Sequence, residues 1–301
     1  MTFVDPDAAE EPARDADAEG AAALDLRALA LREYADRRAA DFLLGELARI
    51  RSTVEGYVRN GKDAALAAMQ TPAFWEDDDR YAVLAEAEYL DRLEAAFATA
   101  AKLGERLSRH ADRSRNGTGE LAGLLALRLH VLDAALQGLD DGRHGDVFLR
   151  IRAATSDEGP AGARWTDALG EMYAGWARRR GMRLERLDAG DHLYLVSGLG
   201  AETLLAGEAG LHVLEMPEEG REDGRADRLH AIVDAVASPA AQAADSEPPA
   251  VHARSLLGRA PSSDSVVRRY RREPAPLVRD SVRGYRTGRL DRVLAGDFDL
   301  F

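Results

Sequence analysis

The stretch WTDALGEMYAGWARRRGMRLERL, residues 165–187, predicts a helix that runs directly into a strand. Six apolar residues between Trp165 and Trp176 recur at the three- and four-residue spacing of one face of an amphipathic helix. Gly181 follows, and glycine readily takes the left-handed conformation that ends helices. Met182 and Leu184 then alternate with charged residues, as in a half-buried strand. The stretch therefore predicts a unit in which a helix packs on a sheet.

Composition limits the classes of protein that fit the chain. Its 301 residues, 46% hydrophobic and 31% charged, are enough for about two domains with real cores. The absence of cysteine excludes disulfides, thiolate catalysis and cysteine-ligated zinc. Seven scattered histidines show no metal-binding spacing, so we expect neither a metal nor another cofactor. No apolar run suits a membrane span and the N-terminus lacks signal-peptide features, so we expect a cytoplasmic protein.

Charge is distributed unevenly along the chain. The formal net charge of −13 argues against a protein that coats nucleic acid non-specifically. Residues 1–20 hold seven acidic residues against one arginine, whereas residues 251–301 hold eleven arginines against six acidic residues. This asymmetry predicts an acidic tail and a basic patch. Arginine binds phosphate well through its two-pronged guanidinium, although a GC-rich genome produces the same excess of arginine over lysine.

The organisation along the chain predicts the α+β class, with a helical bundle followed by a mixed sheet with helices. Asn60-Gly61 is a helix-stop signal, and Thr71-Pro72 breaks the next helix because a residue before proline avoids the helical region. The segment 228–238 fits either a helix or a strand. The predicted parts are an acidic disordered tail over 1–22, a helical domain over 23–145, an α+β domain over 146–240, a linker over 241–265, and a C-terminal segment over 266–301 that packs back on the α+β domain.

Four stretches, in order, resemble bacterial class I peptide chain release factors, and the reader of UGA and UAA in particular. They are TPAFWEDDDR at 71–80, the run from VFLRIRAA at 147 to the opening stretch, ETLLAGEAGLHVLE at 202–215, and RDSVRGYRTGRLDRVLAGDFDLF at 279–301. Within the opening stretch the matching positions are Trp165, Leu169, Met172, Tyr173, Trp176, Ala177, Arg180 and Gly181. The resemblance covers 60–240 and 266–301, and it implies a helical first domain and a second domain that lies at the ribosomal decoding centre.

The catalytic part of that family is missing here. The resemblance implies a Gly-Gly-Gln loop, whose glutamine N–H supports ester hydrolysis in the peptidyl transferase centre. This sequence contains no Gly-Gly pair, and Gln70, Gln137 and Gln242 lie in unrelated contexts. The interval Pro239 to Ser265 is also too short to fold the domain that carries the loop. We therefore expect a degenerate paralogue that is not an enzyme.

The codon-reading part is missing as well. The family members that read UGA and UAA carry Ser-Pro-Phe at a position where this chain has MPEEGREDGRADRLH, residues 216–230. The acidic residues Glu218, Glu219, Glu222 and Asp223 in this interval would be repelled by RNA phosphates. Val213 also replaces the arginine that follows the family's histidine, which His212 matches. We expect neither stop-codon reading nor peptidyl-tRNA hydrolysis.

The leading hypothesis is a translation-associated pseudo-release factor that binds the ribosome or another structured RNA through an arginine face. Its predicted RNA-binding residues are Arg268, Arg269, Arg271, Arg272, Arg279, Arg283 and Arg286. Arginines around Tyr270 on a strand offer phosphate contacts and one stacking ring. The alternative for this patch is an edge strand kept charged against aggregation.

Two other functions stay open at this point. An acidic protein adaptor would reuse the same scaffold to bind a protein partner, in line with the negative net charge. A new enzyme would take its acid–base groups from Asp191, His192, Glu208 and His212, although nothing in the sequence fixes their geometry. We expect no membrane partner for any of the three.

Overall fold

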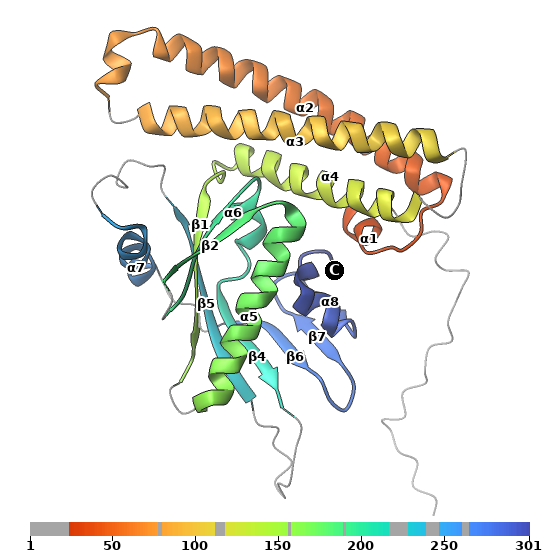
Figure 1. Ribbon diagram of the computed structural model, residues 1–301, viewed down its shortest axis with the longest axis vertical. Coiled ribbons are helices and arrows are strands. Elements are labelled where there is room, and N and C mark those ends of the chain that lie inside the picture. Colours follow the sequence, from red (N-terminus) through yellow and green to blue (C-terminus); the bar gives the residue numbers. More distant parts are fainter. Residues whose placement is uncertain are drawn as a thin grey trace, which may run out of the picture.

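The computed structural model describes residues 24–77, 80–111, 118–155, 158–188, 191–216, 228–238, 247–260 and 265–301. Helices fill the N-terminal part and an eight-stranded mixed sheet fills the rest (Figure 1), which confirms the predicted α+β class. The predicted tail over 1–22 and most of the interval that replaces the codon reader, 217–227, lie outside the described residues. No helix in the described ranges is long and apolar enough to cross a membrane.

The helical part is a long antiparallel hairpin with a third helix packed along it. The elements are α1 (Leu26–Ala30), α2 (Arg37–Met69), the 3-10 helix η2 (Pro72–Trp75), α3 (Arg80–Ala111) and α4 (Thr118–Asp140). Leucines and alanines from all four α-helices form one core. Asp36 caps α2 by accepting a hydrogen bond from the Ala39 N–H at 2.7 Å.

The predicted helix stop at Asn60-Gly61 is wrong, because α2 continues to Met69. Gly61 faces α3 instead, and a Cβ on it would lie 2.2 Å from Leu90 Cδ1. This glycine therefore allows the two helices to approach closely. The predicted break at Thr71-Pro72 is confirmed, since Pro72 opens the short helix that turns the chain toward α3.

The sheet has the strand order β2-β3-β1-β5-β4-β6-β7-β8. All neighbouring pairs are antiparallel except β4 and β6, which are parallel. The strands are β1 (Asp146–Ala153), β2 (Arg183–Asp188), β3 (His192–Ser197), β4 (Gly210–Glu215), β5 (Arg228–Ser238), β6 (Val266–Arg271), β7 (Leu277–Asp280) and β8 (Arg286–Thr287). The segment that fitted either a helix or a strand is β5, which is hydrogen-bonded along both edges.

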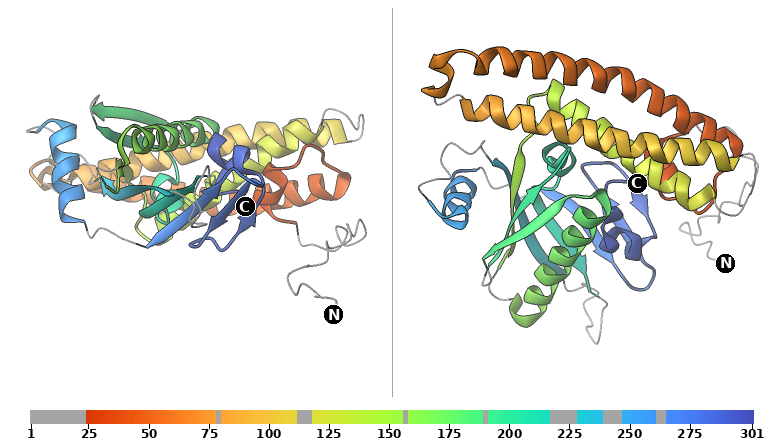
Figure 2. Two further views of the ribbon diagram at one scale, coloured as in Figure 1. Left: turned by 90° about the horizontal axis from the view of Figure 1, so that it is seen from below. Right: turned by 45° about the horizontal axis from the view of Figure 1, so that its top comes forward.

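The helix predicted from the opening stretch is α5 (Gly159–Arg180), which lies across one face of the sheet (Figures 1 and 2). Its apolar stripe is buried, as predicted, against inward side chains of β1, β3 and β5. Gly181 has φ of 73°, and the next N–H, of Met182, bonds the Ala177 carbonyl at 2.8 Å. The helix–strand boundary is therefore where the sequence predicts it.

The opposite face of the sheet carries a helix over part of its area. Helix α7 (Pro249–Arg259) buries Ala253 and Leu257 against Phe148 and Leu193. The prediction of a linker over 241–265 is wrong for these residues, because small and apolar side chains spaced four apart give the segment one packing face. Residues 241–246 and 261–264 of that prediction lie outside the described ranges.

The C-terminal segment completes the core beneath α5. After β8 it forms α8 (Leu290–Arg292), the π-helical turn η4 (Val293–Asp297) and a short end. The Phe298 ring stacks on Trp176, with centroids 5.9 Å apart, and meets Tyr173 edge-on at 5.5 Å. The short helix α6 (Ala201–Leu205) joins this unit to the helical part, where the Gly200 N–H donates to the Tyr89 hydroxyl at 3.1 Å.

Candidate nucleic-acid interface

Strand β6 sends its arginines to opposite faces of the sheet, because side chains alternate along a strand. Arg268 and Tyr270 point toward α5, whereas Arg269 and Arg271 point away from it. Arg268 is 0% exposed. The prediction that Arg268 contacts RNA from the surface is therefore wrong, since α5 and the C-terminal segment cover its face of the strand.

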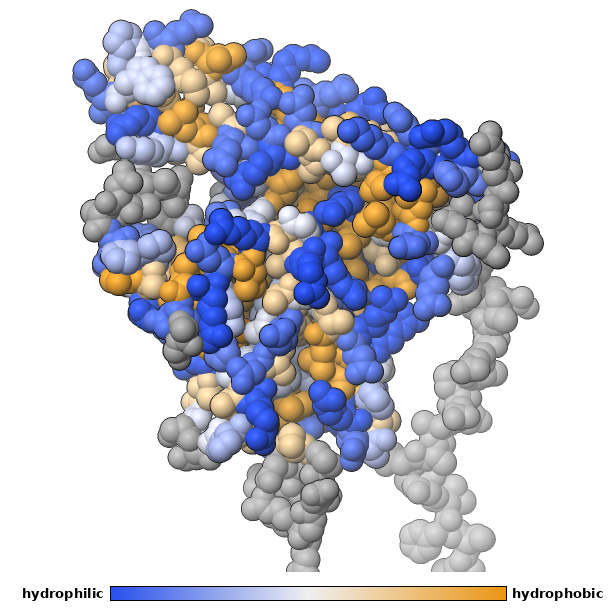
Figure 3. All heavy atoms as spheres, in the orientation of Figure 1, coloured by the Kyte–Doolittle hydropathy of each residue, from blue (hydrophilic) through white to orange (hydrophobic). Residues whose placement is uncertain are grey.

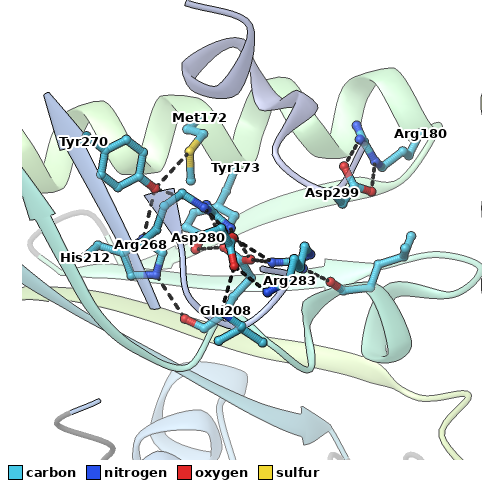
Figure 4. Close-up of polar contacts among 12 residues, drawn as sticks. Met172, Tyr173, Arg180, Glu208, His212, Arg268, Tyr270, Asp280, Arg283 and Asp299 are labelled. Atoms are coloured by element: carbon cyan, nitrogen blue, oxygen red, sulfur yellow. Dashed lines mark hydrogen bonds and ion pairs between the residues drawn. The ribbon is translucent and has the colours of Figure 1, made fainter. Parts of the chain in front are cut away.

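Arg268 belongs to a buried ion cluster with Glu208, Asp280 and Arg283 (Figure 4). Its Nη2 lies 2.7 Å from Glu208 Oε1 and 2.7 Å from Asp280 Oδ2. Arg283 reaches the same two carboxylates from the turn after β7 and donates to the Leu204 carbonyl at 3.0 Å. Two cations thus meet two anions, so the cluster is neutral and each buried charge has a partner.

The cluster sets the ionisation of its neighbours. Burial by itself would raise the pKa of Glu208, but Arg268 and Arg283 lower this pKa to about 2. Burial lowers the pKa of His212 to about 4, so the imidazole is neutral at physiological pH. Its Nε2 donates to the Glu208 carbonyl at 3.1 Å, which leaves Nδ1 to accept from the Tyr270 hydroxyl at 3.1 Å. These contacts join β4, β6 and the turn before β4 into one rigid unit.

The four residues of the enzyme hypothesis do not form one group. Glu208 and His212 lie together in the core and are 0% exposed. His192 instead lies 3.3 Å from Asp167, and Asp191 lies 3.9 Å from Arg254. Within the described ranges, no group of three histidine, aspartate or glutamate side chains is placed to hold a metal ion.

The outward face of the C-terminal strands carries a line of three arginines. Arg269 on β6 lies directly opposite Arg279 on β7, and Arg279 lies opposite Arg286 on β8. We call Arg269, Arg279 and Arg286 the arginine row. Arg279 and Arg286 are exposed, and Arg269 is half-buried. In the part of the chain that the structure describes, none of the three has a carboxylate within 4.0 Å.

The arginine row is costly as a purely structural feature. Like charges that face each other on neighbouring strands destabilise a sheet. Elsewhere on the same face the chain avoids this cost, because Arg150 and Arg152 of β1 share Asp234 of β5 at 2.8 and 3.3 Å. The row therefore concentrates positive charge that no carboxylate of the described residues balances.

The remaining predicted residues differ in their placement. Arg272 is exposed just after β6. Arg271 is half-buried, and its Nε donates to the Ala275 carbonyl at 3.3 Å. Arg283 is mostly covered and belongs to the buried ion cluster. Of the seven arginines, the structure thus brings three into a row, leaves two near its end and places two inside the molecule.

Sequence reasoning missed a cleft beside the row. The cleft has a volume of about 880 Å³ and lies between α1, the loop that follows it, and the C-terminal segment. Arg286 of the row lines it together with Arg32, Arg289 and Arg292. Arg32 is about 250 residues away from the others in sequence, so only the packing of the helical part on the C-terminal segment brings them together.

The face of the molecule that carries α5 is mostly hydrophilic. Figure 3 shows the face that carries α5, where hydrophobic residues form small separate patches among hydrophilic ones. Trp75 at the α2–α3 turn is 56% exposed, whereas its neighbour Phe74 is buried and pins the turn. Phe74 therefore fixes the turn by its burial, whereas most of the Trp75 ring faces solvent.

The proteins compared with this chain include solved structures that are similar to it. No protein-family model matches the sequence. The structure of "RF2 of Thermus thermophilus" is similar over 80% of this chain and 92% of that chain, with 18% sequence identity and a TM-score of 0.39. This likeness is distant, and the function of the chain is argued below from its own residues.

Proposed function

We propose that this chain is a non-catalytic, release-factor-like protein of the translation machinery that binds ribosomal or another structured RNA through the arginine row. One observation carries the RNA part of this proposal: three arginines, none with a carboxylate partner among the described residues, face one another across β6, β7 and β8. The ribosome is the expected source of the RNA because of the sequence resemblance. The missing Gly-Gly-Gln loop and codon-reading tripeptide support the absence of hydrolysis and stop-codon reading.

Phosphate is the ligand that best suits the row. Neighbouring strands place the arginine stems about 4.8 Å apart, and each guanidinium presents several N–H donors to phosphate oxygens. Contacts of this kind fix the position of a protein on RNA without reading sequence. A phosphate backbone would also relieve the repulsion within the row, because each guanidinium gains an anionic partner.

Co-sedimentation with ribosomes of the same organism at rising salt tests the proposal, together with fluorescence anisotropy on a ribosomal RNA hairpin. Arg279→Gln removes the central charge of the row, so it should weaken binding and reduce the slope of log K against log salt by about 1. Arg183→Gln is the matched control, because Arg183 lies at the opposite edge of the sheet and is paired with Glu185. Equal effects of the two substitutions, or an unchanged slope with Arg279→Gln, would contradict the role of the row.

A second candidate function is a protein adaptor, and the exposed ring of Trp75 favours it. Trp75 lies at the tip of the α2–α3 hairpin, and its Nε1 donates to the Met69 carbonyl at 3.2 Å, which fixes the ring. An exposed, fixed tryptophan is a typical anchor of protein interfaces. Ribosome association that survives Arg279→Gln but is lost with Trp75→Ala would favour the adaptor over the RNA-binding protein.

A further inference from the structure

The cleft beside the arginine row is lined by more cations than anions. Arg32 and Arg289 have no carboxylate partner among the described residues, and the same holds for Arg286. Arg292 is held in the wall of the cleft, since it lies 3.4 Å from Asp297 and donates to the Leu31 carbonyl at 3.3 Å. Asp25 and Glu33 are the acidic residues of the lining. The side chains therefore leave the cleft with a net positive charge.

The cleft also holds an exposed aromatic ring on a firm support. Tyr34 lines it and is 65% exposed. The backbone at Tyr34 is packed against the start of α4, because a Cβ on Gly119 would lie 2.8 Å from Tyr34 Cα and 2.1 Å from the Glu33 carbonyl oxygen. The backbone at Tyr34 is therefore held in place, while its ring is open to a flat ligand that stacks on it.

We infer that this cleft receives an unpaired strand of the bound RNA, with Tyr34 stacking on a base and Arg32, Arg286 and Arg289 contacting the backbone. The inference rests on the proposed function, because it extends the same RNA from the arginine row into the cleft. Arg286 belongs to both features, so a strand that leaves the row at β8 enters the cleft directly. The RNA class that the protein selects is therefore a structured element with an unpaired flank.

The chemistry of the cleft favours a nucleic-acid strand over an acidic peptide. A flat exposed ring beside several guanidiniums offers a stacking platform and a path for a phosphate backbone, which is how proteins bind single strands. An acidic peptide would use the arginines but would gain little from Tyr34. The volume of about 880 Å³ falls in the usual range of ligand sites, about 300–1,000 Å³.

Fluorescence anisotropy on two RNAs tests the inference with the full chain. One RNA is a blunt hairpin, and the other is the same hairpin with a short unpaired flank. The flank should tighten binding of the wild-type protein, and Tyr34→Ala should remove a gain of about 5- to 150-fold, the range measured for one stacked base. Tyr34→Phe should keep the gain because stacking requires only the ring. Blunt-hairpin binding should be the same in all three proteins.

Trp75→Ala is the matched control, because it removes a similarly exposed ring from the turn at the other end of the helical layer (Figure 1). It should leave the gain from the flank unchanged. Equal binding of the two RNAs by the wild-type protein would overturn the cleft as a strand site, and so would equal losses with Tyr34→Ala and Trp75→Ala. In either case, weaker binding of the blunt hairpin by the Arg279→Gln variant would still support the proposed function. Failure of the blunt hairpin to bind at low salt would instead overturn the proposed function.

Discussion

Arg180 at the end of α5 pairs with Asp299, 119 residues later in the chain, through two hydrogen bonds from one guanidinium to one carboxylate. The Nε–Oδ2 distance is 2.9 Å, and His130 of α4 lies 3.4 Å from the same carboxylate. The side chains of Arg180 and Asp299 are 0% and 2% exposed. Because three segments meet at one buried carboxylate, this pair couples the helical part, α5 and the C-terminal segment.

Asp299→Asn should lower the free energy of unfolding by about 3–5 kcal/mol, because it leaves the Arg180 charge buried without a counter-charge. Urea denaturation followed by circular dichroism measures the change. The double variant Arg180→Met, Asp299→Leu should recover much of the loss, since it removes both charges together. A loss below about 1 kcal/mol for Asp299→Asn would match an exposed ion pair and would contradict the buried arrangement.

The stability of the protein should fall as pH is lowered from 6.5 to 4 through His212. Burial lowers the pKa of His212 from its ordinary 6.5 to about 4, so between these values the unfolded state binds a proton that the folded state does not. The contribution of His212 amounts to about 3 kcal/mol across this window. Below it, Glu208 acts in the same direction, since its stabilising charge is lost as pH falls from 4.5 toward about 2.

Urea denaturation at several pH values measures this dependence in the wild type and in His212→Gln. Glutamine keeps a donor and an acceptor but cannot take up a proton in this range. The difference in slope between the two proteins isolates His212 from the other histidines. Parallel curves from pH 6.5 to 4 would show that His212 is protonated in the folded state.

Gly296→Ala should lower the free energy of unfolding by about 3 kcal/mol, because it combines backbone strain with a clash. Gly296 has φ of 103°, and a Cβ on it would lie 2.3 Å from the backbone nitrogen of Trp176. Gly284→Ala is the control, since Gly284 has φ of 73° but open space around it. Thermal denaturation should show a much smaller loss for the control, about 1 kcal/mol from strain alone. Similar losses would mean that α5 and η4 can move apart at no cost.

Deletion of residues 1–22 should strengthen RNA binding at low ionic strength. The deleted segment holds seven acidic residues and one arginine, so its removal takes six negative charges from a chain that carries −13. The association rate constant should rise by up to about tenfold, because repulsion from the phosphates decreases. Stopped-flow measurements at several salt concentrations should show the difference shrinking as the Debye length falls to about 8 Å at physiological salt.

Neutralisation provides the control for this deletion. A full-length variant in which the seven acidic residues are changed to serine should associate as fast as the deleted chain. If the deleted chain associates faster than the wild type but the neutralised variant does not, the effect comes from the length of the segment rather than from its charge.

Much of the fold follows from local patterns in the sequence. The stripe from Trp165 to Trp176 and the glycine at 181 place α5 and its end correctly. Proline at 72 marks the turn between the long helices. The prediction of a helix end at Asn60-Gly61 was wrong because glycine can either end a helix or allow two helices to approach closely. Only the packing against Leu90 shows that Gly61 does the second. Helix α7 was missed because its packing face depends on Phe148 and Leu193, about 105 and 60 residues earlier in the chain.

The candidate site was predictable in part. The basic C-terminal segment is evident from composition, and the alternation in VVRRYRR, with Tyr270 two residues after Arg268, indicates that Arg268 and Arg269 point to opposite faces. The prediction that all seven arginines share one face did not take this alternation into account. The alignment of Arg269, Arg279 and Arg286 depends on the register of three strands, and the cleft depends on a helix from the other end of the chain. Neither can be read from local sequence.

The parallel pairing of β4 with β6 and the burial of Phe298 have a consequence for biosynthesis. Glu208 has no buried counter-charge until Arg268 has been synthesised, and the core beneath α5 is incomplete until Phe298 has been synthesised. A nascent chain that has been synthesised only as far as β5 therefore lacks Phe298, which covers α5, and lacks the strands β6, β7 and β8 that carry the arginine row. The core beneath α5 and the arginine row therefore assemble only after residues 266–298 have been synthesised.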